Sequence, residues 1–197
     1  MRLKLSFIFV TVLSLLSSMS VSAARPQVEI TTNKGSFIVE LASYRAPGSV
    51  KNFLRYVDRK FYDNTVFHRI EADFVIQGGG FDINYNYKEN RGGIKNESDN
   101  GLTNSRGTIA MARTEDVHSA NSQFYINLSD NRSLDAKYGR LGYTVFGKVI
   151  SGMDVVDEIG KVKVATVQGI GETVPVNPIV IQMIRRIEVK KEPKQKN

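Results

Sequence analysis

The residues of this sequence that could do chemistry are one arginine and two glutamines set among apolar and aromatic neighbours. Arg69 lies in the stretch FHRIEADFVIQGGGFD, and Gln77 follows it eight positions later. In the stretch TIAMARTEDVHSANSQFY, Gln123 precedes Tyr125 by two residues, so the two side chains share a face if the segment is a strand. Arginine and glutamine side chains can donate several hydrogen bonds to a carbonyl group of a ligand.

Two roles are open for Arg69 from the residues alone. Strand alternation would place Arg69 on the same face as Phe67 and Glu71. His68 and Ile70 would then occupy the opposite face. Arg69 would either pair with Glu71 at the surface or meet a bound ligand, and sequence spacing by itself favours the ion pair.

Several kinds of chemistry are excluded by what the sequence lacks. There is no cysteine, which removes thiol catalysis and cysteine-zinc sites. The two histidines, His68 and His118, stand in no HxxxH or HExxH arrangement, so we expect no metal ion. The glycines at 78–80 do not fit a phosphate-binding loop, and Ser122 lacks a plausible histidine and acid partner for hydrolysis. We therefore expect neither a metal nor a cofactor.

The order of the motifs resembles that of the cyclophilin-type peptidyl-prolyl isomerases, and most closely their bacterial periplasmic branch. FHR…F.IQGG is followed by MA…NSQF and then by VFGKV, and the similarity extends from about Val28 to Ile187. The resemblance implies an enzyme that accelerates rotation about Xaa-Pro bonds. Such rotation crosses a barrier of ~18–20 kcal/mol and breaks no bond, so it needs neither a nucleophile nor a general base.

The resemblance also implies which residues form the site. Arg69 would be catalytic, bonding the prolyl carbonyl and reaching toward the prolyl nitrogen as conjugation is lost. Gln77 and Gln123 would hold the peptide backbone or orient the guanidinium. The pyrrolidine ring would enter an apolar pocket formed by Phe74, Val75, Tyr125 and Leu134. The remaining substrate-binding positions lie at the rim: His68, Ala112, Arg113 and Tyr143. For His68 a mainly structural role stays open.

The sequence departs from the common family pattern around this pocket. Val75 stands where many members have methionine, Tyr125 where they have phenylalanine, and Arg113 where they have asparagine. Tyr143 occupies a position where histidine is common. Ser133 occupies the position of a tryptophan that many cyclosporin-sensitive members carry. We therefore expect the isomerase activity to be kept and cyclosporin to bind weakly.

Hydrophobic periodicity predicts many short strands and two helices. The strands are expected at 28–32, 36–42, 65–70, 73–78, 108–112, 122–128, 144–150 and 178–189. The helices are expected at 48–58 and 153–159, and a polar loop from Phe81 to Arg106. In the last strand, Ile179, Ile181, Met183 and Ile187 keep a period of two.

This pattern is typical of an antiparallel barrel or sandwich, and we find no internal repeat or second domain. The resemblance narrows the fold to a mainly β structure. It implies a closed eight-stranded antiparallel barrel capped by two α-helices, one over each end.

The first 23 residues have the order of a secretory signal peptide. Arg2 and Lys4 precede an apolar run that ends at Leu16, and small residues follow up to Ala23. The run is shorter than the roughly 20 residues that span a bilayer. We therefore expect cleavage after Ala23, no stable membrane insertion afterwards, and export to the periplasm or beyond.

The rest of the chain divides into a domain and a tail. Residues 24–189 are expected to form the isomerase domain, and residues 190–197 a basic flexible tail with four lysines and one glutamate. Much of the formal charge of +7 therefore falls at the two ends of the chain, so we expect no nucleic-acid binding. The tail could instead dock on an acidic surface or on membrane headgroups.

Together these features predict an exported monomer that isomerises Xaa-Pro bonds in proline-containing unfolded or partly folded polypeptides. The rival hypothesis is a non-catalytic Xaa-Pro binding module, or a holdase chaperone, on the same fold. Arg69 together with Gln77 and Gln123 favours the enzyme, because binding alone would tolerate loss of the arginine donor.

Overall fold

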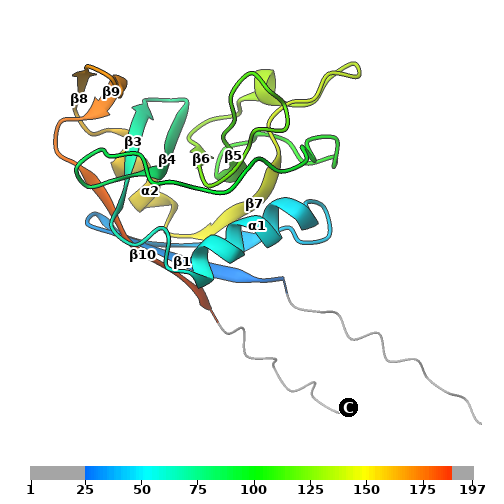
Figure 1. Cartoon of the computed structure of the whole chain (residues 1–197), viewed down its shortest axis with the longest axis horizontal. Coiled ribbons are helices and arrows are strands. Elements are labelled where there is room, and N and C mark those ends of the chain that lie inside the picture. The colour runs from blue at the N-terminus through cyan, green and yellow to red at the C-terminus, as the bar shows by residue number, and fades with distance from the viewer. Residues whose placement is uncertain (1–24, 188–197) are drawn as a thin grey trace, which may run out of the picture.

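The computed structural model describes residues 25–187, which form a closed antiparallel β-barrel with two helices packed against it (Figure 1). The predicted signal peptide at 1–23 and basic tail at 190–197 lie outside the described residues. The strands close in the order β1-β10-β3-β4-β6-β5-β7-β2. Their bounds are β1 Gln27–Thr32, β2 Gly35–Leu41, β3 Thr65–Glu71, β4 Val75–Asp82, β5 Thr108–Met111, β6 Phe124–Asn127, β7 Val145–Ser151 and β10 Ile179–Ile187. The predicted fold class is confirmed.

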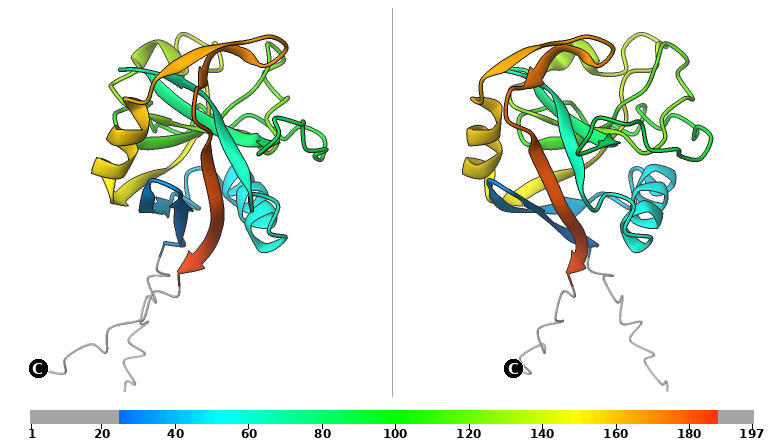
Figure 2. Two further views of the ribbon diagram at one scale, coloured as in Figure 1. Left: turned by 90° about the vertical axis from the view of Figure 1, so that its left-hand side faces the viewer. Right: turned by 60° about the vertical axis from the view of Figure 1, so that its left-hand side comes forward.

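Both predicted helices are present, α1 at Pro47–Asp58 and α2 at Met153–Gly160. They lie on opposite sides of the barrel (Figure 2). Pro47 begins α1, where its missing N–H removes no helical hydrogen bond. Among the described residues, no helix has the length and apolar character required to cross a membrane.

The barrel interior is filled by side chains from the strands and from both helices. Phe53 of α1 packs against Tyr62, Phe124 and Phe146, with ring centroids 5.2–5.6 Å apart. From α2, Val156 and Ile159 join the same core and are fully buried. Complete burial of large aromatic rings contributes much of the stability of a barrel of this size, which has no disulfide.

Two irregularities change which strand residues face the core. In β3, Phe67 pairs with Gly78 and Arg69 with Gln77, so His68 is an extra residue on the β3 side. The expectation that Phe67 and Arg69 share a face is therefore wrong, since Phe67 is fully buried in the core and Arg69 lies outside.

A second shift occurs in β10. Thr31 pairs with Met183 but Thr32 pairs with Ile181, which leaves Gln182 unmatched. Ile179 and Ile181 face the core as expected, but Met183 is 41% exposed and Ile184 takes the buried position. The predicted period of two over the whole strand is wrong beyond Ile181 for this reason.

A small two-stranded sheet was not expected from the sequence. It consists of β8 (Val164–Val167) and β9 (Gly171–Pro175), and Gly169 allows the turn with a φ of +81°. The hairpin stands beside β3, outside the barrel (Figure 1). It adds a wall next to the predicted site.

Candidate active site

The residues expected to form the site lie on the outer surface of the barrel. Backbone register explains why, because Arg69 pairs with Gln77, Gln77 with Tyr125, and Tyr125 with Ala110 across β3, β4, β6 and β5. A single row across the sheet thus carries both the polar and the apolar groups. The residues that precede Gln77 and Tyr125 in the chain, Ile76 and Phe124, point into the core instead.

This row lines a pocket of about 270 Å³. Nine residues surround the pocket, and every one of them was expected from the sequence: Arg69, Phe74, Val75, Gln77, Ala112, Arg113, Tyr125, Leu134 and Tyr143. Behind it lies an apolar cluster, separate from the barrel core, that contains Val75, Ala110 and Tyr125. The pocket therefore has an apolar floor and a polar rim, and its size suits a small ring.

Arg69 stands at the rim in a fixed orientation. Its Nη1 donates to Gln77 Oε1 at 3.2 Å, and its Nη2 donates to Glu71 Oε1 at 2.5 Å. Gln77 in turn donates from Nε2 to Gln123 Oε1 at 3.0 Å. The ion pair with Glu71 and a place at the pocket, which sequence reasoning treated as alternatives, are both present.

The fork of the guanidinium carries five N–H donors, and the two bonds to Gln77 and Glu71 leave others for a ligand. Its carbon lies 5.9 Å from the centroid of the Phe74 ring. A carbonyl on a ring held over Phe74 would thus lie within reach of a permanent positive charge.

Arg113 and Tyr143 form a second part of the rim. The Arg113 guanidinium lies 4.4 Å over the Tyr143 ring, and its Nη1 donates to Thr114 O at 2.8 Å. Tyr143 meets Tyr125 edge to face, with centroids 6.0 Å apart. Its place over the Tyr143 ring holds Arg113 along the pocket edge, so its positive charge lies at the rim of the pocket.

His68 and Gln123 line a neighbouring hollow of about 420 Å³, which shares Arg69 and Gln77 with the first pocket. His68 is 6% exposed and packs against the tilted ring of Phe81, with centroids 4.6 Å apart. Burial, with the charge of Arg69 as a smaller cause, lowers the pKa of His68 to about 4. His68 is therefore neutral at neutral pH.

The hollow also shows which neighbouring residues the sequence reasoning missed. Its outer side is formed by Ile170–Thr173 of the β8–β9 hairpin, and Phe81 and Glu71 complete the lining. The run VATV followed by Gly169 was the available signal for the hairpin. Among residues 25–187 no group of three or more His, Cys, Asp or Glu side chains is arranged to hold a metal ion.

The fold and the site together define a barrel protein that binds a small apolar ring beside a fixed guanidinium. The nine residues that line the pocket include no Ser, Thr, Cys, His, Lys, Asp or Glu. An arrangement of this kind can hold one half of an amide and stabilise charge redistribution along it, which lowers a rotational barrier without breaking a bond.

Comparison with known proteins agrees with this geometry. The family described as "Cyclophilin type peptidyl-prolyl cis-trans isomerase/CLD" matches residues 27–186. A peptidyl-prolyl cis-trans isomerase of Acinetobacter baylyi is 51% identical over 158 residues, 80% of this chain and 84% of that protein. Peptidyl-prolyl cis-trans isomerase A of Dickeya dadantii is 46% identical over 181 residues, 91% of this chain and 95% of that one.

Among solved structures, a cyclophilin type isomerase of Cryptosporidium parvum in the presence of the dipeptide Ala-Pro superposes with a TM-score of 0.69 at 26% identity. The match covers 83% of this chain and 99% of that chain. The chain belongs to the cyclophilin-type peptidyl-prolyl cis-trans isomerase family. It is a peptidyl-prolyl cis-trans isomerase.

Proposed function

We propose that this isomerase acts on Xaa-Pro bonds of exported polypeptides while they fold, with Arg69 as its catalytic residue. The observation that carries the proposal is the row formed by Arg69, Gln77 and Tyr125, which sets a braced guanidinium beside an apolar pocket. The Ala-Pro dipeptide present with the Cryptosporidium parvum relative supports a proline-containing ligand.

The proline ring would lie in the apolar part of the pocket. Val75 and Tyr125 form its buried floor, at 1% and 4% exposure, and Phe74 and Leu134 form half-buried sides. Immobilising the ring leaves the preceding residue as the half that rotates. Ala112 and Arg113 follow β5 directly, so their segment would lie along the residues before the proline.

Arg69 would stabilise the twisted amide. As the C–N bond rotates, conjugation is lost and the lone pair of the prolyl nitrogen becomes localised on that atom, where it can accept a hydrogen bond. A guanidinium fixed by Gln77 and Glu71 is oriented before the substrate arrives, so little reorganisation accompanies the transition state. Turnover on the order of a thousand per second would require lowering the barrier by about 6–7 kcal/mol.

The export setting rests on residues 1–23, which have the order of a secretory signal. We propose cleavage after Ala23, so that the mature chain begins at Ala24 and residues 24–189 form the working domain. Fractionation of producing cells followed by N-terminal sequencing tests this directly. Recovery of the intact N-terminus in the cytoplasmic fraction would contradict the export proposal and leave the activity untouched.

The same site is proposed to bind cyclosporin weakly. Ser133 is exposed within the short 3-10 helix η1 (Arg132–Leu134), so a small polar side chain stands where many cyclosporin-sensitive members have tryptophan. Loss of an indole removes a large apolar contact from the rim.

The decisive experiment is an isomerase assay on the mature chain with a tetrapeptide that contains one Xaa-Pro bond. Acceleration of both the peptide reaction and proline-limited refolding of a protein is the expected result. Binding of the peptide without acceleration would support a binding module or holdase in place of the proposed folding role.

A further inference from the structure

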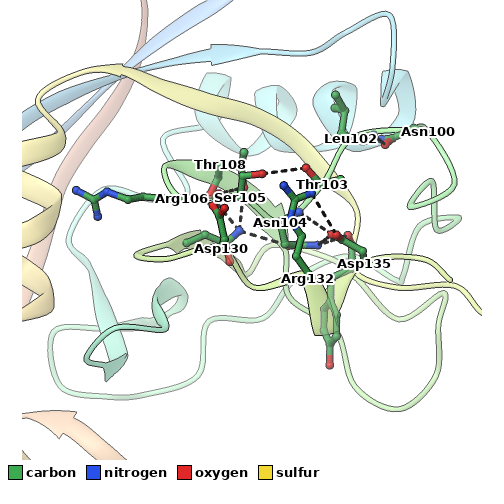
Figure 3. Close-up of polar contacts among 12 residues, drawn as sticks. Asn100, Leu102, Thr103, Asn104, Ser105, Arg106, Thr108, Asp130, Arg132 and Asp135 are labelled. Carbon is green, nitrogen blue, oxygen red and sulfur yellow. Dashed lines mark hydrogen bonds and ion pairs between the residues drawn. The ribbon is translucent and has the colours of Figure 1, made fainter.

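Three buried asparagines and one partly exposed aspartate form a hydrogen-bonded network directly behind the proposed proline pocket. Its members are Asn104, Asn127, Asn131 and Asp135, and we call them the asparagine network. The three asparagines are 1%, 0% and 8% exposed. Figure 3 shows Asn104, in the loop of residues 100–106, joined to Asp135 by hydrogen bonds. The chemistry described so far uses none of these residues.

Asn104 connects the floor of the pocket to one of its sides. The hydroxyl of Tyr125 donates to Asn104 Oδ1 at 2.7 Å. Asn104 donates to Asp135 Oδ1 from both its backbone N, at 2.6 Å, and its side-chain Nδ2, at 2.9 Å. Asp135 directly follows Leu134, so one asparagine sets where Tyr125 and Leu134 stand relative to each other.

Asn131 and Asn127 connect Phe74, on the opposite side of the pocket, to Asn104. Asn131 Nδ2 donates to Phe74 O at 2.9 Å and to Asn127 Oδ1 at 2.8 Å. Asn127 Nδ2 donates to Asn104 Oδ1 at 3.3 Å, which closes the chain of bonds. The backbone of Phe74 is thereby tied to the same group of amides as Tyr125 and Leu134.

The loop that carries Asn104 is itself fixed in place. The backbone N of Arg106 donates to Asp130 Oδ1 at 2.8 Å, and its side chain donates to Leu128 O at 2.7 Å. Asn131 N donates to Asn104 O at 2.7 Å. A buried amide that loses its hydrogen-bond partner costs about 1–3 kcal/mol of stability. A fully bonded network of this kind therefore restricts the movement of the side chains in it.

The Tyr125 hydroxyl links the asparagine network to the floor of the pocket. A tyrosine at this position stands where many family members have phenylalanine, so the ring alone suffices to floor a pocket. The hydroxyl is buried and satisfied by Asn104, and burial raises the pKa of Tyr125, so it stays a neutral donor. Its bond fixes the depth of the ring in the pocket.

We infer that Asn104 is a positioning residue that, through the Tyr125 hydroxyl and Asp135, holds the pocket to the width of a five-membered ring. The inference rests on the proposed function of this pocket. The network makes the enzyme selective for proline over its six-membered homologue, pipecolic acid, which differs by one methylene. In a rigid apolar pocket one extra methylene is discriminated by about 10–200-fold.

The test compares kcat/KM for two tetrapeptides that differ only in proline or pipecolic acid. Asn104→Ala removes the link between Tyr125 and Asp135, and Tyr125→Phe removes only the hydroxyl. Thr32→Ala is the matched control, because Thr32 is 4% exposed and donates its hydroxyl to Gly35 O at 2.8 Å in the distant β1–β2 turn. Thermal melting reports the stability of each variant.

We expect the proline to pipecolic acid ratio to fall by about threefold or more in both Asn104→Ala and Tyr125→Phe, and to stay at the wild-type value in Thr32→Ala. The double variant should fall no further than Asn104→Ala alone, because both changes break the same connection. An unchanged ratio in Tyr125→Phe, or effects that add in the double variant, would overturn the inference. The proposed function is tested separately, by the acceleration of the proline peptide by the wild-type enzyme, which does not depend on the ratios measured for the variants.

Discussion

Replacing Arg69 by alanine should remove most of the catalysis while leaving the protein folded. The Arg69 guanidinium is a charged donor at the pocket, held in place by Gln77, which is itself bonded to Gln123. Loss of a preorganised donor to developing charge lowers kcat by about 10²–10³, or about 2.7–4 kcal/mol. This is roughly half of the 6–7 kcal/mol that rapid turnover requires, so some acceleration by the apolar pocket should remain.

The effect on stability should be small. The side chains of Arg69 and Glu71 are 37% and 36% exposed, and an ion pair at such a position contributes ~0–1 kcal/mol. Arg69→Lys keeps the charge but loses the planar fork that reaches Gln77 and Glu71 together, so it should fall between wild type and alanine, with a loss of about tenfold.

The assay is the cis-to-trans rate of an Xaa-Pro tetrapeptide, with proline-limited refolding as a second substrate. Arg186→Ala is the control, because Arg186 also forms a two-pronged pair, with Asp58 at 2.7 Å, yet it lies on β10 away from the pocket. That variant should retain full activity. Equal acceleration by Arg69→Ala and wild type would refute the catalytic role of Arg69.

Three further predictions address other parts of the site. Gly80→Ala should lower kcat/KM by about tenfold, because an added Cβ would stand 2.6 Å from the Gln123 side chain and break the hydrogen bond between Gln123 and Gln77. Gly92→Ala is the control and should match wild type, because an added Cβ there would meet open space. Since the pKa of His68 is about 4 in the folded protein and about 6.5 unfolded, the unfolded state binds the extra proton, and the free energy of unfolding should fall as pH drops from 6.5 to 4, by on the order of 3 kcal/mol. His68→Gln should flatten that part of the pH profile in chemical denaturation, and an identical slope in both proteins would count against a buried neutral His68. Ser133→Trp should tighten cyclosporin binding by about tenfold or more in calorimetry, while nanomolar inhibition of the wild-type enzyme would disprove weak binding.

Hydrophobic alternation and turn residues mark most of the strands, but they predicted only an antiparallel barrel or sandwich, and the choice of the barrel came from the family resemblance. Helix bounds were right to within a residue or two, since α1 and α2 have clear three- and four-residue spacing. The nine pocket residues came from family motifs, and the structure brings them together by a row of strand pairings that no local pattern reveals.

The errors have a common physical origin. Unmatched residues at His68 and Gln182 shift the register by one, which exchanges the inner and outer faces of β3 and β10. Such shifts depend on the partner strand, so period-two reasoning on one strand cannot locate them. The asparagine network was missed for a similar reason, because its members are distributed over a loop, a strand end and η1 and meet only in the folded chain.

The closure of the barrel has a consequence for an enzyme proposed to act on polypeptides while they fold. Each of its eight strands has a partner on both sides over at least part of its length, so the barrel has no strand with a wholly open edge. Unfolded polypeptides recruit open sheet edges as templates for aggregation. A closed barrel therefore gives partly folded chains few strand edges on which to aggregate. Because the site lies on the outside of the barrel, it can bind a proline in the middle of a chain, and no free chain end has to enter it.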